Sequence, residues 1–289
     1  MEPKKPNVLI IGSAKCGTTT LAQVLDEHPD CCLSKPKEVR FFDLDKNYQK
    51  GELWYSQHFA HHTNEKVIID ATPNYAAMPN NRSAERIYNF NPEMKLVYIV
   101  RNPIARLVSS WKMHLHHRNH FLHKPAKKGF ESYVSYLKSH TTHWCHYKYG
   151  YQLNHYKKFF PTENIHVMFL EDLINNEDLE FNKLYAFLGI AKPEQIEVKA
   201  SNTAEDKRTL TPFFRFVYDN KLDGVIKKIV PEATRNRLKK NIKIHEKMTY
   251  PEPLISENLQ IEFINYVNKD ITLFLNEYGK TEDFWQLKF

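Results

Sequence analysis

Glycine and cysteine are scarce in this chain. Only 8 of its 289 residues are glycine and 4 are cysteine. The cysteines have no metal-ligand spacing and form a poor disulfide framework, so we expect reduced thiols. The apolar run near the N-terminus, Val8–Ile11, is too short to cross a membrane, and no small-residue cleavage site accompanies it. We therefore expect a soluble, cytoplasmic protein that does not bind a membrane.

What the chain does contain favours one folded domain over residues 1–289. Apolar residues make up 42% of the sequence and aromatic residues 13%, which predicts a substantial core. No segment has the composition of a linker, a repeat or a low-complexity region. The net charge of +7 favours anionic ligands, although basic enzymes also carry such a charge for no specific reason.

Short apolar runs that alternate with helical patterns predict the fold class. We expect an α/β domain, with a central, mostly parallel sheet flanked by helices and a helical C-terminal part. A polar stretch at residues 192–212 is the best candidate for a loop. The predicted strands are 8–11, 67–70, 95–100 and 165–170, and the predicted helices are 18–26, 104 to about 117, and 257–278.

A glycine loop follows the first predicted strand and leads into a helix. Its glycines, Gly12 and Gly17, have the spacing of the nucleotide-binding loop G-x-x-x-x-G-K-[ST]. Thr18, however, stands where that loop has its lysine, and a lysine occurs earlier, at Lys15. The strand–loop–helix context still predicts an anion site, because helix N-terminal N–H groups attract phosphates.

A second candidate anion site is the stretch "RNPIARLVSSW" (101–111). Arg101 ends a predicted strand and Pro103 opens a helix, on which Arg106 and Ser109 share one face. Two arginines and a hydroxyl at a helix start can bind a phosphate. The residues alone leave open whether Arg101 and Arg106 bind an anion or serve as structural partners.

Together these motifs resemble the sulfotransferases that use 3′-phosphoadenosine 5′-phosphosulfate (PAPS). The loop is similar to the family pattern K-x-G-T-[TS]-x-L, and residues 101–109 are similar to R-[DN]-P-x-x-R-x-x-S. Residues 28–55 resemble the heparan-sulfate-type branch, and weaker similarity extends over most of the chain. The departure is "DATPNY" (70–75), where Ala71 replaces a lysine usual in that branch.

The resemblance implies a role for each site. It implies that Lys15 acts on the oxygen bridging phosphate and sulfur, and that Arg101 and Ser109 bind the 3′-phosphate. It implies no metal. Lys207 and Arg208 fall where relatives close a segment over the nucleotide. The residues expected around the 5′-phosphate are Lys15, Cys16, Gly17, Thr18, Thr19 and Thr20.

Glu38 matches the glutamate that serves as catalytic base in the resembled branch. The resemblance implies in-line transfer of the sulfuryl group to a hydroxyl or amine. The missing lysine favours a small acceptor, such as a bacterial alkaloid-type secondary metabolite, over a glycan. A histidine of residues 114–123 is the alternative base, and the same histidine-rich run is a weak candidate for a metal site. The expected acceptor-side residues are Lys37, Phe42, Asp70, Tyr75 and His114.

Other classes of function fit the sequence less well. A P-loop kinase or NTPase is disfavoured by Thr18 in the lysine position and by the lack of an evident magnesium carboxylate. A nucleic-acid binder is disfavoured because the positive charge is spread along the chain and no recognition motif is present. The sequence leaves the oligomeric state undetermined.

Overall fold

The computed structural model describes residues 4–78, 82–120, 129–193, 208–210, 245–247 and 249–288. Contacts divide the chain into two compact units. The first comprises residues 1–106, 136–201 and 257–289, and the second comprises residues 107–135 and 202–256.

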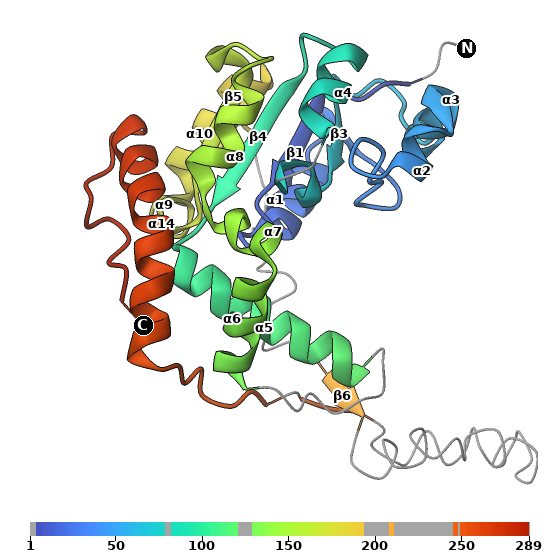
Figure 1. Cartoon of the computed structure of the whole chain (residues 1–289). Helices are drawn as coiled ribbons and strands as arrows, with labels where there is room; N and C mark the ends of the chain where they lie inside the picture. Colours follow the sequence, from blue (N-terminus) through green and yellow to red (C-terminus); the bar gives the residue numbers. More distant parts are fainter. Residues whose placement is uncertain are drawn as a thin grey trace, which may run out of the picture. The chain divides into compact units, whose positions relative to one another are not determined.

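The first unit is built on a five-stranded sheet in which every neighbouring pair of strands is parallel (Figure 1). The order is β2-β3-β1-β4-β5, so the first strand lies in the centre. The predicted α/β fold class with a parallel sheet is confirmed. The strands are β1 (Val8–Gly12), β2 (Cys31–Leu33), β3 (Val67–Ala71), β4 (Lys95–Val100) and β5 (Ile165–Phe169).

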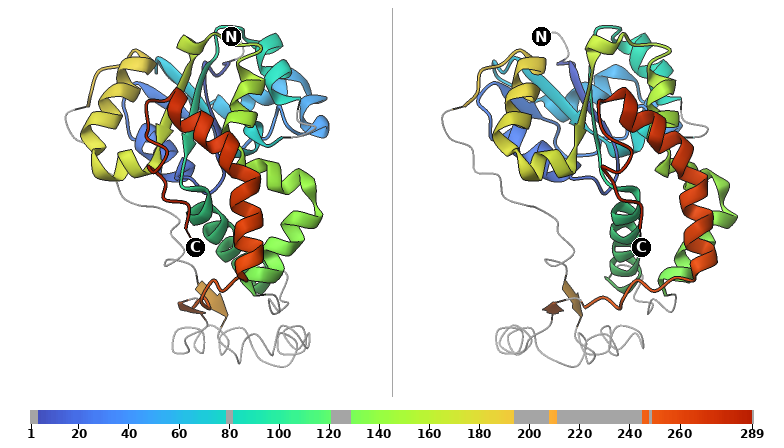
Figure 2. Two further views of the ribbon diagram at one scale, coloured as in Figure 1. Left: turned by 60° about the vertical axis from the view of Figure 1, so that its left-hand side comes forward. Right: turned by 90° about the vertical axis from the view of Figure 1, so that its left-hand side faces the viewer.

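Helices cover both faces of this sheet (Figure 2). The connections β1–β2 and β3–β4 run in opposite directions across the sheet, so right-handed crossovers place their helices on opposite faces. Helix α1 (Thr18–Asp26) therefore covers one face and α4 (Ser83–Phe90) the other. Helix α10 (Glu177–Leu188) shares the apolar core with α1, whereas α8 (Tyr149–Tyr156) packs with α14 (Glu257–Glu277).

Shorter elements complete the first unit. They are α2 (Asp45–Tyr48), α3 (Gly51–Ser56), α7 (Thr141–Trp144), α9 (Leu170–Asn175), η1 (Gln57–Phe59), η2 (Pro73–Ala76), η3 (Cys145–Tyr147) and η4 (Thr162–Asn164).

The parallel arrangement decides where a ligand can bind. All five strands are parallel, so their carboxyl ends lie at one edge of the sheet. Ligands of open α/β sheets bind outside this edge. The segments that leave β1, β2, β3 and β4 contain the glycine loop, Glu38, residues 72–75 and Arg101, so the topology brings all four candidate stretches of the first unit to that edge.

The second unit contains helical segments and a small antiparallel pair of strands. Helix α5 (Pro103–His120) belongs to it from Leu107 onward, and α6 (Phe130–Ser139) begins in it. Strands β6 (Arg208–Leu210) and β7 (His245–Lys247) pair with each other. Its aromatic packing includes Trp111 and Phe130, whose ring centroids are 5.3 Å apart.

Most predicted elements agree with the structure to within a few residues. The helix predicted over 18–26 is observed with the same bounds, and the long C-terminal helix ends one residue before its predicted end. The predicted loop at 192–212 lies mostly outside the described residues. Within the described part of the chain, no helix has the length and apolar character that a membrane span requires.

Candidate functional site

The loop between β1 and α1 presents backbone N–H groups at a helix N-terminus. Gly17 precedes the helix with φ of 92°, and the first helical hydrogen bond runs from the Leu21 N–H to the Gly17 carbonyl at 3.0 Å. The N–H groups before Leu21 therefore have no acceptor within the helix. The first turn of α1 carries no acidic residue that would repel an anion. This geometry suits a phosphate group.

Both glycines of the loop are required by close packing. A Cβ on Gly12 would lie 3.0 Å from the Ala76 Cβ, and one on Gly17 would lie 3.0 Å from a Leu170 methyl group. Gly17 also has a left-handed backbone, which side chains other than glycine rarely adopt. The spacing that identified this loop in the sequence thus reflects steric needs on both sides of the bend.

Lys15 adopts a left-handed backbone with φ of 69°, although it is not glycine. Such a conformation costs free energy of order 1–3 kcal/mol and occurs where a structure constrains it, often at functional sites. The side chain is partly exposed, and Lys15 is the only charged residue between Gly12 and Thr20. Lys15 is therefore the one cation that this loop can direct at an anion.

Arg106 has a structural role, because it binds the backbone of the glycine loop. Its buried guanidinium donates from Nε to the Ala14 carbonyl at 2.9 Å and from Nη1 to the His146 carbonyl. The rings of Tyr147 and Tyr149 lie 4.9 and 5.4 Å from the guanidinium carbon. Of the two roles that the sequence left open for this arginine, the structure assigns that of structural partner.

The Cys16 side chain points into the core, so its burial does not support the contact with the 5′-phosphate expected from sequence. Its side chain is fully buried, and its N–H donates to the Ser13 carbonyl at 3.2 Å. Burial raises the pKa of the Cys16 thiol to about 11, so the thiol stays neutral. Thr18 is also buried, whereas Thr19 and Thr20 are partly exposed in the first turn of the helix.

Glu38 lies in the segment that follows β2, with about half of its side chain exposed. Its carboxylate pairs with the Lys37 ammonium at 2.8 Å. Glu38 and Arg40 both have left-handed backbones, with φ of 64° and 57°. The two residues expected to carry out catalysis, Lys15 and Glu38, are thus both held in conformations that side chains rarely adopt.

Three of the expected acceptor-side residues are fully buried. Phe42, Asp70 and Tyr75 have relative exposures of 0%. The Asp70 carboxylate accepts hydrogen bonds from the hydroxyls of Tyr55, Thr72 and Tyr75 at 2.6–2.8 Å. Burial raises the pKa of Asp70, and these hydroxyls oppose that rise. The burial does not favour direct contact with a substrate, and Ala71, also buried, provides no cation there.

Arg101 leaves the carboxyl end of β4 at the start of helix α5. Asn102 caps this helix, because its Oδ1 accepts from the N–H groups of Ile104 and Ala105 at 2.9 and 3.2 Å. The Asn102 N–H in turn donates to Glu171 Oε1 at 2.8 Å, and Glu171 Oε2 accepts from the Trp285 indole at 3.0 Å. This support for Arg101 was not expected from the sequence, although Asn before Pro is a recognisable helix-start signal.

The remaining expected residues belong to the second unit or lie outside the description. Ser109 is partly exposed on α5, and the His114 ring packs 5.3 Å from the Tyr133 ring within the second unit. Arg208 begins β6, and Lys207 lies outside the described residues. Among the residues that the structure describes, no group of three or more His, Cys, Asp or Glu side chains is arranged to hold a metal ion.

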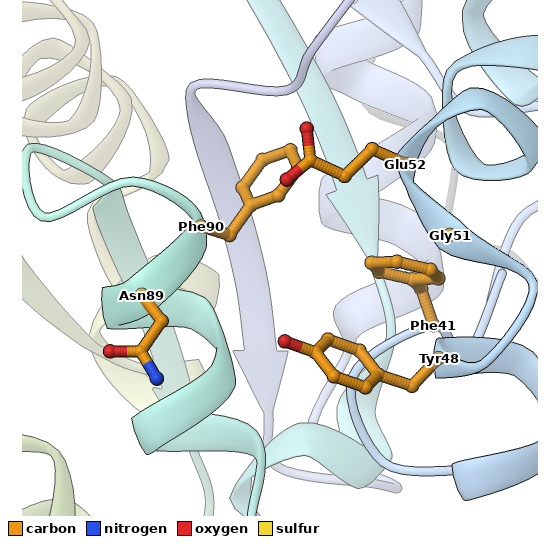
Figure 3. Close-up of a pocket in the computed structure, with 6 residues that line it drawn as sticks. All are labelled: Phe41, Tyr48, Gly51, Glu52, Asn89 and Phe90. Atoms are coloured by element: carbon orange, nitrogen blue, oxygen red, sulfur yellow. The ribbon is translucent and has the colours of Figure 1, made fainter.

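A cavity of about 250 Å³ lies beside the buried cluster around Asp70, because the Phe41 ring that lines it contacts the Phe42 ring at 4.9 Å (Figure 3). The Phe41, Tyr48 and Phe90 rings surround it together with the Glu52 carboxylate. Glu52 already pairs with the Lys5 ammonium at 2.7 Å, and this ammonium also lies over the Phe90 ring. None of the expected site residues lines this cavity, whose full lining is Phe41, Tyr48, Gly51, Glu52, Asn89 and Phe90.

Comparison with known proteins gives a consistent picture. A family model described as the sulfotransferase domain matches residues 5–218. Heparan sulfate glucosamine 3-O-sulfotransferase 5 from Mus musculus is 29% identical over 188 residues, which cover 64% of this chain and 54% of that protein. The membrane-associated sulfotransferase kil1 from Dictyostelium discoideum is 25% identical, covering 69% and 59%. The chain thus spans somewhat more than half the length of these relatives.

A solved structure is similar over nearly the whole chain. The sulfotransferase from Alicyclobacillus acidocaldarius aligns with a TM-score of 0.65 and 19% identity, covering 98% of this chain and 99% of that one. At this identity the likeness concerns the fold. The family resemblance inferred from the two phosphate motifs is confirmed by the family model.

Proposed function

Because the chain belongs to the sulfotransferase domain family, we propose that it is a PAPS-dependent enzyme that transfers a sulfuryl group to a hydroxyl or amine. The observation that carries the proposal is the loop from Gly12 to Thr20. It combines the N–H groups of the first turn of α1 with a single cation, Lys15, and with hydroxyls in place of the lysine of a triphosphate loop. This donor set fits one 5′-phosphate that bears a sulfuryl group.

The residues of the loop would bind and orient the donor. The N–H groups of the first turn of α1 and the hydroxyls of Thr19 and Thr20 would hold the 5′-phosphate. Arg101 and Ser109, which the family motif assigns to the 3′-phosphate, would distinguish PAPS from ATP. PAPS supplies the sulfuryl group. Lys15 would stabilise the negative charge that grows on the leaving phosphate oxygen, an effect worth roughly 3–4 kcal/mol for a preorganised donor.

Glu38 would act as the general base. Its carboxylate would accept the proton of the acceptor hydroxyl or amine while that atom bonds to sulfur and the bond from sulfur to the phosphate oxygen breaks. Such a base contributes about 10²–10⁴ in rate. The ion pair with Lys37 holds the carboxylate at the exposed side of its segment, and Lys37 would move aside or contact the acceptor.

The acceptor that we favour is a small molecule of a cytoplasmic secondary pathway, such as an alkaloid-type metabolite. Ala71 supports this choice, because a lysine usual in the heparan-sulfate-type branch is missing there and the alanine side chain is buried. A glycan acceptor is the second candidate, favoured by the names of the relatives that are 29% identical over 64% of the chain.

Two measurements test the proposal. Adenosine 3′,5′-bisphosphate should raise the melting temperature far more than ATP with magnesium, because a ligand stabilises the state that binds it. Purified protein with PAPS should add a mass of about 80 Da, that of SO₃, to a component of a metabolite extract; heparan sulfate in place of the extract tests the second candidate. Equal thermal shifts for the two nucleotides would contradict the proposal.

Variants test the roles of the two residues. Glu38→Gln should lower turnover by about 10²–10⁴ and leave nucleotide binding intact. Glu52→Gln is the matched control, since Glu52 is also about half exposed and also pairs with a lysine. A Glu38→Gln enzyme with the wild-type rate would remove Glu38 as the base. Lys15→Ala should lower turnover by about 10²–10³ without unfolding the protein.

A further inference from the structure

The backbone around Glu38 is strained and needs contacts that hold it. Glu38 and Arg40 have positive φ values, and such residues persist only where surrounding structure constrains them. Glu38 itself is half exposed, and within the described part of the chain its side chain pairs with the neighbouring Lys37 alone. Its position therefore depends on hydrogen bonds made by the backbone of the residues that follow it.

Two buried hydroxyls accept hydrogen bonds from this backbone. The Phe41 N–H donates to the Tyr75 hydroxyl at 3.0 Å, and the Arg40 N–H donates to Thr72 Oγ1 at 3.4 Å. Both hydroxyls lie at the carboxyl end of β3 or just beyond it, at the edge where the glycine loop lies. They connect the Glu38 segment to the sheet.

The Asp70 carboxylate decides the direction of both hydrogen bonds. Thr72 Oγ1 donates to Asp70 Oδ1 at 2.7 Å, and the Tyr75 hydroxyl donates to Oδ2 at 2.6 Å. A hydroxyl has one proton to donate. When that proton points at a carboxylate, the lone pairs of the oxygen remain for the N–H groups of Arg40 and Phe41.

We propose that Asp70, Thr72 and Tyr75 are positioning residues that fix the Glu38 segment for catalysis without touching the substrate. The inference rests on the proposed role of Glu38 as the base. Asp70 accepts the two hydroxyl protons, the hydroxyls accept the two backbone N–H groups, and the strained backbone then carries Glu38 out to the exposed side. All three residues are fully buried, which suits positioning and excludes direct contact in this conformation.

Tyr55 provides a matched control within the same cluster. It is as buried as Tyr75, at 1% against 0%, and it donates to the same oxygen of Asp70 at 2.8 Å. Its hydroxyl accepts no hydrogen bond from the described residues 34–43, and its ring stacks on Phe41 in a contact that phenylalanine would keep. Tyr55→Phe and Tyr75→Phe therefore each delete one buried hydrogen bond to Asp70 Oδ2, but only Tyr75→Phe also deletes the acceptor of the Phe41 N–H.

The first arm of the test is hydrogen exchange of the full chain, read by mass spectrometry on peptides that cover residues 34–43. This measurement does not require the sulfuryl acceptor to be known. Tyr75→Phe should speed exchange in these peptides at least tenfold, and Tyr55→Phe should leave them within about twofold of wild type. Equal effects of the two variants, or none, would overturn the positioning role whether or not the protein is a sulfotransferase.

The second arm is turnover with PAPS and the acceptor found by the mass screen. Tyr75→Phe should lower kcat by about 10–100-fold, because a misplacement of about 1 Å can cost 10²-fold, while KM for PAPS stays within about twofold. Thr72→Ser should retain kcat and Thr72→Val should lose it. Equal kcat values for Tyr55→Phe and Tyr75→Phe would overturn the link to catalysis. A wild-type rate for Glu38→Gln would instead refute the proposed base.

Discussion

The sharpest prediction from the fold concerns Arg106, which holds the glycine loop through the Ala14 carbonyl. Arg106→Lys keeps the positive charge but replaces a planar fork with a single ammonium. The ammonium can satisfy the carbonyl of Ala14 or that of His146, but not both, since Nε and Nη1 reach them in different directions.

The magnitude follows from the contacts. One lost hydrogen bond from a charged donor costs about 1.5–3 kcal/mol, and the weakened stacking on Tyr147 and Tyr149 adds about 0.5–1 kcal/mol. We expect the free energy of unfolding to fall by about 2–4 kcal/mol, which lowers the melting temperature by roughly 3–7 °C for a chain of this size. The loosened Ala14 carbonyl should weaken binding of adenosine 3′,5′-bisphosphate about tenfold.

Arg86→Lys is the control for this measurement. Arg86 is as buried as Arg106, since both have a relative exposure of 6%. Arg86 donates to the Phe42 carbonyl at 3.0 Å, pairs with Asp45 and lies over the Tyr48 ring. Its substitution should cost similar stability in a thermal melt but leave nucleotide affinity, measured by calorimetry, unchanged. If Arg106→Lys bound the nucleotide as well as Arg86→Lys does, the reasoning about the loop would be refuted.

Three further predictions concern single positions. Gly17→Ala should cost about 1–2 kcal/mol in urea denaturation and weaken nucleotide binding, and more than Gly51→Ala, because both glycines have positive φ but only the new Cβ at position 17 meets a neighbour. Ser109→Ala should raise KM for PAPS about tenfold with little effect on acceptor KM, and an unchanged KM for PAPS would remove Ser109 from the site. Burial lowers the pKa of His166 from its usual 6.5 to about 4, so the unfolded state takes up a proton first as pH falls, and the stability present above pH 6.5 is lost between 6.5 and 4. His166→Phe should therefore lose about 1.4 kcal/mol less per pH unit in that window, and parallel stability curves for the two proteins would argue against this assignment.

The sequence predicted the strands and helices well where the pattern is local. Apolar runs flanked by polar residues located four strands, and the helix over 18–26 has the same bounds in sequence and structure. Strand β2 was missed, because it has three residues and becomes a strand through pairing with β3. Short edge strands lack the length on which a periodicity argument depends.

The sequence located the motifs of the candidate site, but it did not predict which of its polar side chains are buried. The glycine spacing and the segment around Glu38 are local, so the sequence located them. Asp70 and Tyr75 were expected to face the acceptor, yet whether a polar side chain faces solvent or the core depends on elements far along the chain. The role of Arg106 likewise depends on carbonyls 92 and 40 residues away in sequence. No local pattern contains such partners.

The bond between Trp285 and Glu171 has a practical meaning for anyone who trims or extends this polypeptide. Trp285 lies beyond the last helix, yet its indole is almost entirely enclosed and reaches the carboxylate that also steadies the start of α5. Deleting the residues after α14 would remove the Trp285 ring from its contacts with Tyr149 and Phe169, and it would loosen the backbone at Arg101. The short peptide after α14 is thus part of what holds the start of α5, and a truncation that removes it should destabilise this end of the sheet.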